Sequence, residues 1–113
     1  MTARERIIAA IEHRTPDKVP VDMGSTPSSG ISAAAYARLR SHLGRTDGST
    51  RVYDVVQQLA QPEEWALDRF GVDVVDLGRT FNTEASDWYP VVLSSGDAAE
   101  YPSWFRPEKG GDG

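Results

Sequence analysis

The chain has no cysteine, no long apolar run and no run of basic residues. Without cysteine it can form no disulfide and no thiolate-held zinc site, and it has no thiol nucleophile. The charged start, Met1 to Arg6, is not followed by the apolar stretch of a secretory signal, and no segment is apolar enough to cross a membrane. These absences predict a cytoplasmic protein without a membrane partner.

The charge balance is acidic. The chain carries 12 basic and 17 acidic residues, a net charge of −5, so neither nucleic acid nor an anionic lipid surface is an expected partner. Hydrophobic residues make up 39% of the 113 residues and charged residues 26%, which is too apolar for a disordered chain. A chain of this length is one domain or part of one.

Helical and extended patterns alternate along the chain. Thr2 and Glu5 have the spacing of a capping box, which predicts a first helix. Two β-branched runs predict strands, and a Gly/Ser/Pro-rich stretch between them predicts a loop long enough to line a site. The expected helices lie at about 3–14, 32–44, 52–59 and 62–70, the strands at 19–24, 72–77, 88–93 and 103–106, and the loop at 24–30.

The order of these elements predicts an α/β fold with a parallel sheet. About fifty mostly helical residues separate the first two strands, as the crossover of a parallel pair requires. A parallel sheet is covered on both faces, and two strands with four short helices cannot achieve this. We therefore expect a piece of a larger α/β protein, with a complete small α/β or α+β domain as the alternative.

Two blocks of sequence carry a family pattern. The first is Arg4-Glu5-Arg6-Ile7 … Ala10 followed by His13-Arg14-Thr15-Pro16-Asp17-Lys18-Val19-Pro20-Val21-Asp22. The second is Asp54 … Gln57-Gln58-Leu59-Ala60 … Pro62-Glu63-Glu64 … Arg69-Phe70-Gly71-Val72-Asp73-Val74-Val75. Together they resemble the N-terminal portion of the uroporphyrinogen decarboxylase family, over about residues 3 to 80.

The resemblance implies the N-terminal part of a (β/α)₈ TIM barrel, incomplete in this chain. The helix and the first two barrel strands would extend to about residue 80, a hairpin-like insertion would occupy about 81–107, and a tail would follow at 108–113. The family includes uroporphyrinogen decarboxylases and cobamide-dependent methyltransferases that act on methylated thiols, amines or methoxy compounds.

Two departures from the family pattern favour methyl transfer over decarboxylation. The decarboxylases follow the first strand with an Arg-Gln-Ala-Gly-Arg segment that holds substrate carboxylates, whereas this chain has Gly24 to Gly30 there and no arginine. Guanidinium groups are what a polycarboxylate needs for binding. The decarboxylases also carry an aspartate in a Phe-Ser-Asp context after the second strand, where this chain has Leu77-Gly78-Arg79-Thr80.

Chemistry in such barrels occurs at the carboxyl ends of the strands, which selects Asp22, Gly24 and Arg79 as substrate-binding residues. Asp22 would bind a substrate cation, or else form a turn bond in the loop. Gly24 would allow close approach of a ligand, or only provide a turn conformation. Arg79 would hold a phosphate or carboxylate, or else remain solvated at the surface.

No catalytic residue can be named from the sequence. The methyltransferases hold zinc with a His-x-Cys pair and a distant Cys, so the resemblance implies that zinc and a cobamide belong to a longer parent and that this chain contains no cofactor site. A small-molecule substrate and a corrinoid protein are the implied partners. The leading hypothesis is methyl transfer involving a cobamide, the alternative is uroporphyrinogen decarboxylation, and a non-catalytic α/β binding module is the third. The isolated chain is predicted to be inactive.

Overall fold

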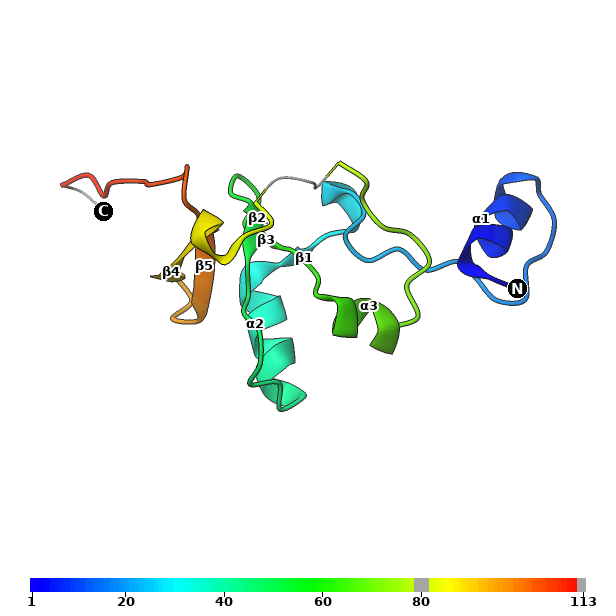
Figure 1. Cartoon of the computed structure of the whole chain (residues 1–113), viewed down its shortest axis with the longest axis horizontal. Coiled ribbons are helices and arrows are strands. Elements are labelled where there is room, and N and C mark those ends of the chain that lie inside the picture. The colour runs from blue at the N-terminus through cyan, green and yellow to red at the C-terminus, as the bar shows by residue number, and fades with distance from the viewer. Residues whose placement is uncertain (79–81, 112–113) are drawn as a thin grey trace.

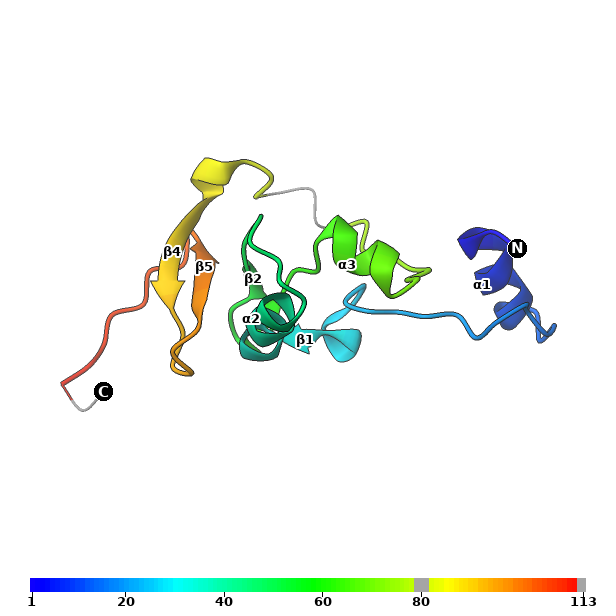
Figure 2. The ribbon, with the colours of Figure 1, turned by 90° about the horizontal axis from the view of Figure 1, so that it is seen from below.

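The computed structural model describes residues 1–78 and 82–111. Figures 1 and 2 show an elongated molecule, with α1 at one end and the β4–β5 hairpin at the other. The elements are α1 (Ala3–Ile11), a 3₁₀ turn (Pro27–Ser29), β1 (Ile31–Ser32), α2 (Ala33–His42), β2 (Val52–Asp54), β3 (Leu59–Ala60), α3 (Glu64–Arg69), a second 3₁₀ turn (Ala85–Asp87), β4 (Trp88–Val92) and β5 (Ala98–Pro102). Within the described ranges, none of the helices is both long and apolar enough to cross a membrane.

The expectation of a parallel barrel segment is wrong for this chain. The described strands form two antiparallel sheets, one in the order β1-β3-β2 and the other the β4–β5 hairpin. The predicted strands 19–24 and 72–77 are not strands, although a single parallel bridge joins Asp22 to Val74. Pro20 has no N–H to donate to a ladder. The α/β content is therefore mixed and antiparallel rather than barrel-like.

Two local expectations also need correction. Residues 52–59 do not form a helix, because β2 and β3 occupy the two ends of the segment and a tight turn joins them. The Asp54 carboxylate accepts hydrogen bonds from the N–H groups of Val56 and Gln57, at 3.1 and 2.9 Å, and Gln58 has a φ of +56°. The hairpin near the end of the chain has its second strand at β5, and a turn replaces the strand expected at 103–106.

The α1 helix begins with the predicted capping box. The Thr2 hydroxyl accepts a hydrogen bond from the Glu5 N–H at 3.2 Å, and the Glu5 carboxylate accepts one from the Thr2 N–H at 2.8 Å. The hydrogen bond from the Thr2 backbone lowers the pKa of Glu5 from its ordinary value. This cap orients the first turn and so places Arg6 on the side of α1 that faces the rest of the chain.

The core is small and lies between α2, the β1-β3-β2 sheet and the hairpin. Tyr36 and Val52 are fully buried. The other buried members of this cluster are Ala33, Ala60, Ala66, Leu93 and Ala99. Because four of the seven members are alanine, the core buries little apolar area for each residue. The fold must therefore depend on polar contacts as well.

A three-charge cluster holds α1 to the rest of the molecule. The Arg6 guanidinium contacts both Asp17 oxygens, at 2.6 and 2.9 Å, and also forms an ion pair with Asp73. The side chains of Arg6 and Asp73 are 9% and 3% exposed. Asp73 also binds Val21 twice: its carboxylate accepts from the Val21 N–H at 2.9 Å, and its N–H donates to the Val21 carbonyl at 2.8 Å.

The molecule is less compact than a typical domain of its size. Its radius of gyration is 16.3 Å, against roughly 13 Å for a compact chain of this length. Its accessible surface is 7491 Å², against roughly 6,100 Å² for a compact protein of this mass. Large apolar side chains near the parallel bridge are exposed, including Val19, Val75 and Leu77. This end of the molecule therefore presents apolar surface to solvent.

Replacing Asp73 with asparagine is expected to destabilise the protein and to weaken its acid sensitivity. Hydrogen bonds from Val21 and Arg6 hold the pKa of Asp73 below its ordinary value of 3.8. A depressed carboxyl pKa stabilises the fold above that ordinary value, and this stability is lost as the pH falls through the folded-state pKa. In urea unfolding, Asp73→Asn should lose part of the decline that the wild type shows below about pH 4.

The matched control is Asp68→Asn, which changes an exposed carboxylate outside this cluster. It should leave both the urea midpoint at neutral pH and its pH dependence close to those of the wild type. Equal pH dependence in Asp73→Asn and wild type would contradict the role of the buried pair.

Candidate functional site

A small cavity lies just beyond the parallel bridge, at the carboxyl ends of the two bridged segments. Its volume is about 140 Å³, and its walls include Gly24, Pro62, Val74 and Asp76. The bridge between Asp22 and Val74 and the two Val21–Asp73 contacts fix these segments side by side. Of the predicted site residues, the structure therefore places Gly24 in the lining of this cavity, and Asp22 lies two residues before it, outside the lining.

Asp22 is occupied within its own loop. Its carboxylate accepts hydrogen bonds from the Ser25 N–H at 3.0 Å and the Ser25 hydroxyl at 2.6 Å. The side chain is exposed, and the residues that line the cavity begin with its neighbour Met23. This geometry matches the turn-forming alternative for Asp22, in which the carboxylate shapes the loop from Gly24 to Gly30.

Position 24 requires glycine, both because of its backbone conformation and because of its close neighbour. Its φ is +86°, and a Cβ placed there would lie 2.8 Å from Cγ of Pro62. The Gly24 N–H donates to the Ser29 carbonyl at 2.9 Å, which closes the loop. The group that approaches Gly24 closely is therefore Pro62, not a ligand. Pro62 lies just before α3 and forms one wall of the cavity.

The other acidic group at this cavity is Asp76, and Arg79 lies outside the described residues. The Asp76 carboxylate accepts a hydrogen bond from the Gly78 N–H at 2.6 Å. Asp73 and Asp76 do not form a paired acid–base set, since Asp73 lies in the cluster with Arg6 and Asp76 lines the cavity. Among the described walls of this cavity, the charged residue is Asp76.

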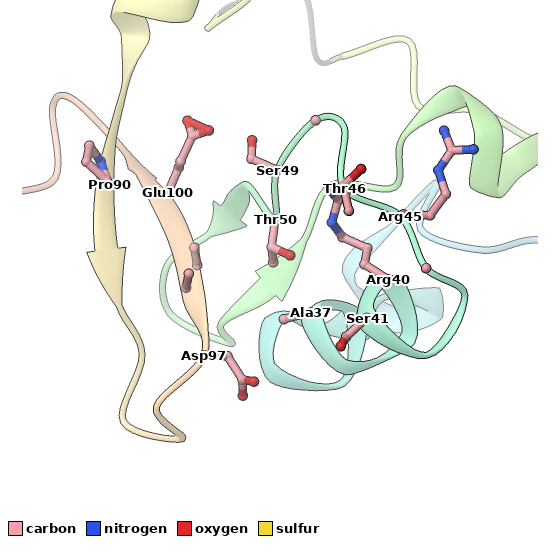
Figure 3. Close-up of a pocket in the computed structure, with 14 residues that line it drawn as sticks. Ala37, Arg40, Ser41, Arg45, Thr46, Ser49, Thr50, Pro90, Asp97 and Glu100 are labelled. Atoms are coloured by element: carbon pink, nitrogen blue, oxygen red, sulfur yellow. The ribbon is translucent and has the colours of Figure 1, made fainter.

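A larger cavity, which the sequence does not predict, lies at the other end of the molecule. Its volume is about 760 Å³, and it separates the hairpin from α2 and the loop that follows α2. Figure 3 shows Pro90, Asp97 and Glu100 on the hairpin side, and Ala37 and Arg40 on the α2 side. Its walls come from segments about fifty residues apart and consist largely of small side chains, so no sequence pattern marks them.

Glu63 joins α2, α3 and the loop between α2 and β2. Its carboxylate accepts hydrogen bonds from the Tyr36 hydroxyl at 2.9 Å and the Trp65 indole at 2.8 Å, and it forms an ion pair with Arg40. The Glu63 N–H donates to the Tyr36 hydroxyl at 3.0 Å. Burial raises the pKa of Tyr36 to about 12. Glu63 is thus a structural hub rather than an available acid or base.

No metal-binding arrangement is found in residues 1–78 and 82–111. No group of three or more His, Asp or Glu side chains in these ranges could hold an ion. His13 follows α1 with a φ of +58°, and His42 is in the last turn of α2. The two histidines therefore belong to separate elements at separate places in the fold.

The chain matches no protein-family model, no curated protein and no solved structure.

Replacing Gly24 with alanine is expected to destabilise the protein more than a positive φ alone would. The left-handed conformation costs an L-residue about 1–2 kcal/mol, and the new Cβ would also press on Pro62. Gly44→Ala is the matched control, because Gly44 has a φ of +69° and nothing within 4 Å of a built Cβ. Urea denaturation should show the larger loss for Gly24→Ala. Equal losses would show that the contact with Pro62 is unimportant.

Replacing Tyr36 with phenylalanine is expected to lower stability by about 1–3 kcal/mol, because it leaves the Glu63 N–H without its buried partner.

The raised pKa of Tyr36 has a second consequence. Between pH 10 and about 12 the unfolded tyrosine loses its proton while the folded one keeps it, so stability falls as the pH rises. This alkaline decline should be smaller in Tyr36→Phe when urea midpoints are measured across that range. An unchanged decline would assign it to other groups.

Proposed function

We propose that this chain contributes a substrate-binding region to an enzyme of the uroporphyrinogen decarboxylase family, and that the reaction is methyl transfer involving a cobamide. The carrying observation is the small acidic cavity beside Asp22, Gly24 and Asp76. It suits a small methylated cation and does not suit a large polyanion. Among the methylated compounds that this family uses, a methylated amine fits the charge of the cavity best.

The residues that carry the family resemblance also meet in space, which supports the proposal. Arg6 and Asp17 belong to the first block and Asp73 to the second, and the three form one ion cluster. The parallel bridge from Asp22 to Val74 joins the same two blocks. Residues far apart in the chain therefore contact one another, and these contacts fix the position of the cavity.

The lining of the cavity argues against a porphyrinogen substrate. A porphyrinogen with many carboxylates needs guanidinium or ammonium groups, and the described walls hold none. The acidic wall residue, Asp76, would repel a carboxylate and attract an ammonium group. On the residues that the structure describes, uroporphyrinogen decarboxylation is therefore the less suitable alternative.

Neither zinc nor a corrinoid fits the residues described here. The chain has no cysteine, and the described residues bring together no group of three or more ligating side chains. A corrin ring is far larger than a cavity of about 140 Å³. The step assigned to this chain is therefore only the binding and orientation of the small substrate.

Trimethylammonium chloride is the probe that tests this proposal. Titration into the full chain, followed by amide chemical shifts in NMR, should show millimolar binding with the shifts at Gly24 and Val74 to Asp76. The variant Asp76→Asn keeps an oxygen for the Gly78 N–H but removes the charge. It should weaken binding about fivefold, the effect of roughly 1 kcal/mol for an exposed ion pair.

Asp68→Asn provides the charge-matched control, since Asp68 is exposed on α3 and does not line the cavity. It should bind the amine as the wild type does. Uroporphyrin, a planar polycarboxylate, should not bind. Tighter binding of uroporphyrin than of the amine, or amine binding that is indifferent to Asp76→Asn, would contradict the proposal.

A further inference from the structure

The β5 strand has an outer edge that is only partly used. In an antiparallel pair, successive residues direct their backbone groups alternately toward the partner strand and away from it. The Leu93 N–H donates to the Asp97 carbonyl at 2.9 Å, and the Ser103 N–H donates to the Asp87 carbonyl at 2.7 Å. These two bonds fix the alternation along the hairpin, so Ala98 and Glu100 direct their backbone groups outward.

Only one of these outward positions is paired. The Glu100 N–H donates to the Thr50 carbonyl at 2.8 Å, and Arg51 forms a parallel bridge with Glu100. The 48–50 segment then diverges from β5, with the Ser49 N–H 3.3 Å from the Glu63 carboxylate. Within the described part of the chain, no backbone group pairs with Ala98 on this edge.

The edge at Ala98 opens into the large cavity. Ala98 and Ala99 line it, and the opposite wall is formed by α2 and the loop that follows α2. The cavity volume of about 760 Å³ lies within the range of known ligand sites. Within residues 97–99 it is Ala98 that directs its N–H and C=O outward, so an added strand would form its backbone hydrogen bonds there.

The four charged residues that line this cavity each have an ion-pair partner. Arg40 pairs with Glu63, Arg45 with Asp47 at 2.9 Å, Asp97 with Arg38 at 3.6 Å, and Glu100 with Arg51 at 3.7 Å. The remaining walls are mostly small, among them Ala37, Gly44, Gly48, Ala98 and Ala99. An occupant of this space therefore needs no net charge. It needs backbone groups for the strand edge and modest apolar side chains for the hollow.

We propose that the Ala98 edge of β5 binds an extended, uncharged peptide segment by strand addition. The peptide backbone would pair with the N–H and C=O of Ala98, and aliphatic side chains at alternate positions would fill the hollow toward α2. A second copy of this chain is the competing occupant, and the experiment distinguishes the two.

The probe is acetyl-Thr-Val-Thr-Val-Thr-amide, titrated into the full chain. Binding is expected with a Kd of roughly 0.1–1 mM. Amide shifts should centre on 97–100, and hydrogen exchange at Ala98 should slow about tenfold at saturation. The same peptide N-methylated at its two valines should not bind, because it lacks the donors for the edge.

Two proline variants form a matched pair. Val92 and Ala98 face each other across the hairpin, and both direct their N–H groups outward. Only that of Ala98 faces the cavity, while Val92 is on the far edge and is 76% exposed. Pro90 already occupies an equivalent outward position on β4. Ala98→Pro should therefore abolish peptide binding, and Val92→Pro should leave it intact, with both variants still unfolding cooperatively.

Several results would overturn the proposal. They are the absence of peptide binding at several millimolar, equal binding of the N-methylated peptide, or equal loss in both proline variants. Protection of the Ala98 amide that grows with protein concentration, without peptide, would assign the edge to a second copy. If Ala98→Pro fails to fold, the comparison of the two peptides on the wild-type protein still decides the question.

Discussion

The ion pair between Arg6 and Asp73 is the contact on which the N-terminal half of the structure depends. A charge that loses its water is costly unless an opposite charge and hydrogen bonds replace that water. Asp73 meets this condition through Arg6 and the Val21 N–H, and Arg6 meets it through Asp73 and Asp17. Loss of Arg6 would leave the buried Asp73 without its opposite charge, and loss of Asp73 would leave Arg6 with only the more exposed Asp17. The helix α1 is therefore attached by electrostatics and hydrogen bonds rather than by a large apolar interface.

The same contacts also set the register between the two chain segments that border the small cavity. Because Asp73 binds Val21 through both its backbone and its side chain, the next residue, Asp22, is aligned with Val74. A shift of one residue would direct each side chain to the opposite face. The position of Gly24 against Pro62 therefore follows from a charge cluster that does not itself touch the cavity. The hydrogen bonds from Ser25 to the Asp22 carboxylate then hold the loop that contains Gly24.

Local features of this fold were predictable from the sequence, whereas long-range features were not. The capping box at Thr2 and Glu5 and the loop after Asp22 depend on neighbouring residues, and their spacing is sufficient evidence. The segment 52–59 has helix-compatible composition, but the hydrogen bonds of Asp54 and the positive φ of Gln58 form a turn instead. Between the two segments predicted as parallel strands, the pairing is limited to the bridge from Asp22 to Val74, because β-branched composition cannot supply the neighbouring strand that a ladder requires. The hub at Glu63 joins residues 27 positions apart and has no periodic signature.

The exposure of the apolar residues near the Asp22–Val74 bridge limits how tightly the small cavity can bind a ligand. Val75 lines the cavity and is 60% exposed, and Leu77 just beyond it is 87% exposed. The methylated amine proposed above would keep part of its surface in water there, and water weakens the attraction between an ammonium group and the Asp76 carboxylate. Weak binding follows directly from this openness. Covering Val75 and Leu77 with apolar surface would remove that water and strengthen the proposed ion pair between an ammonium group and Asp76.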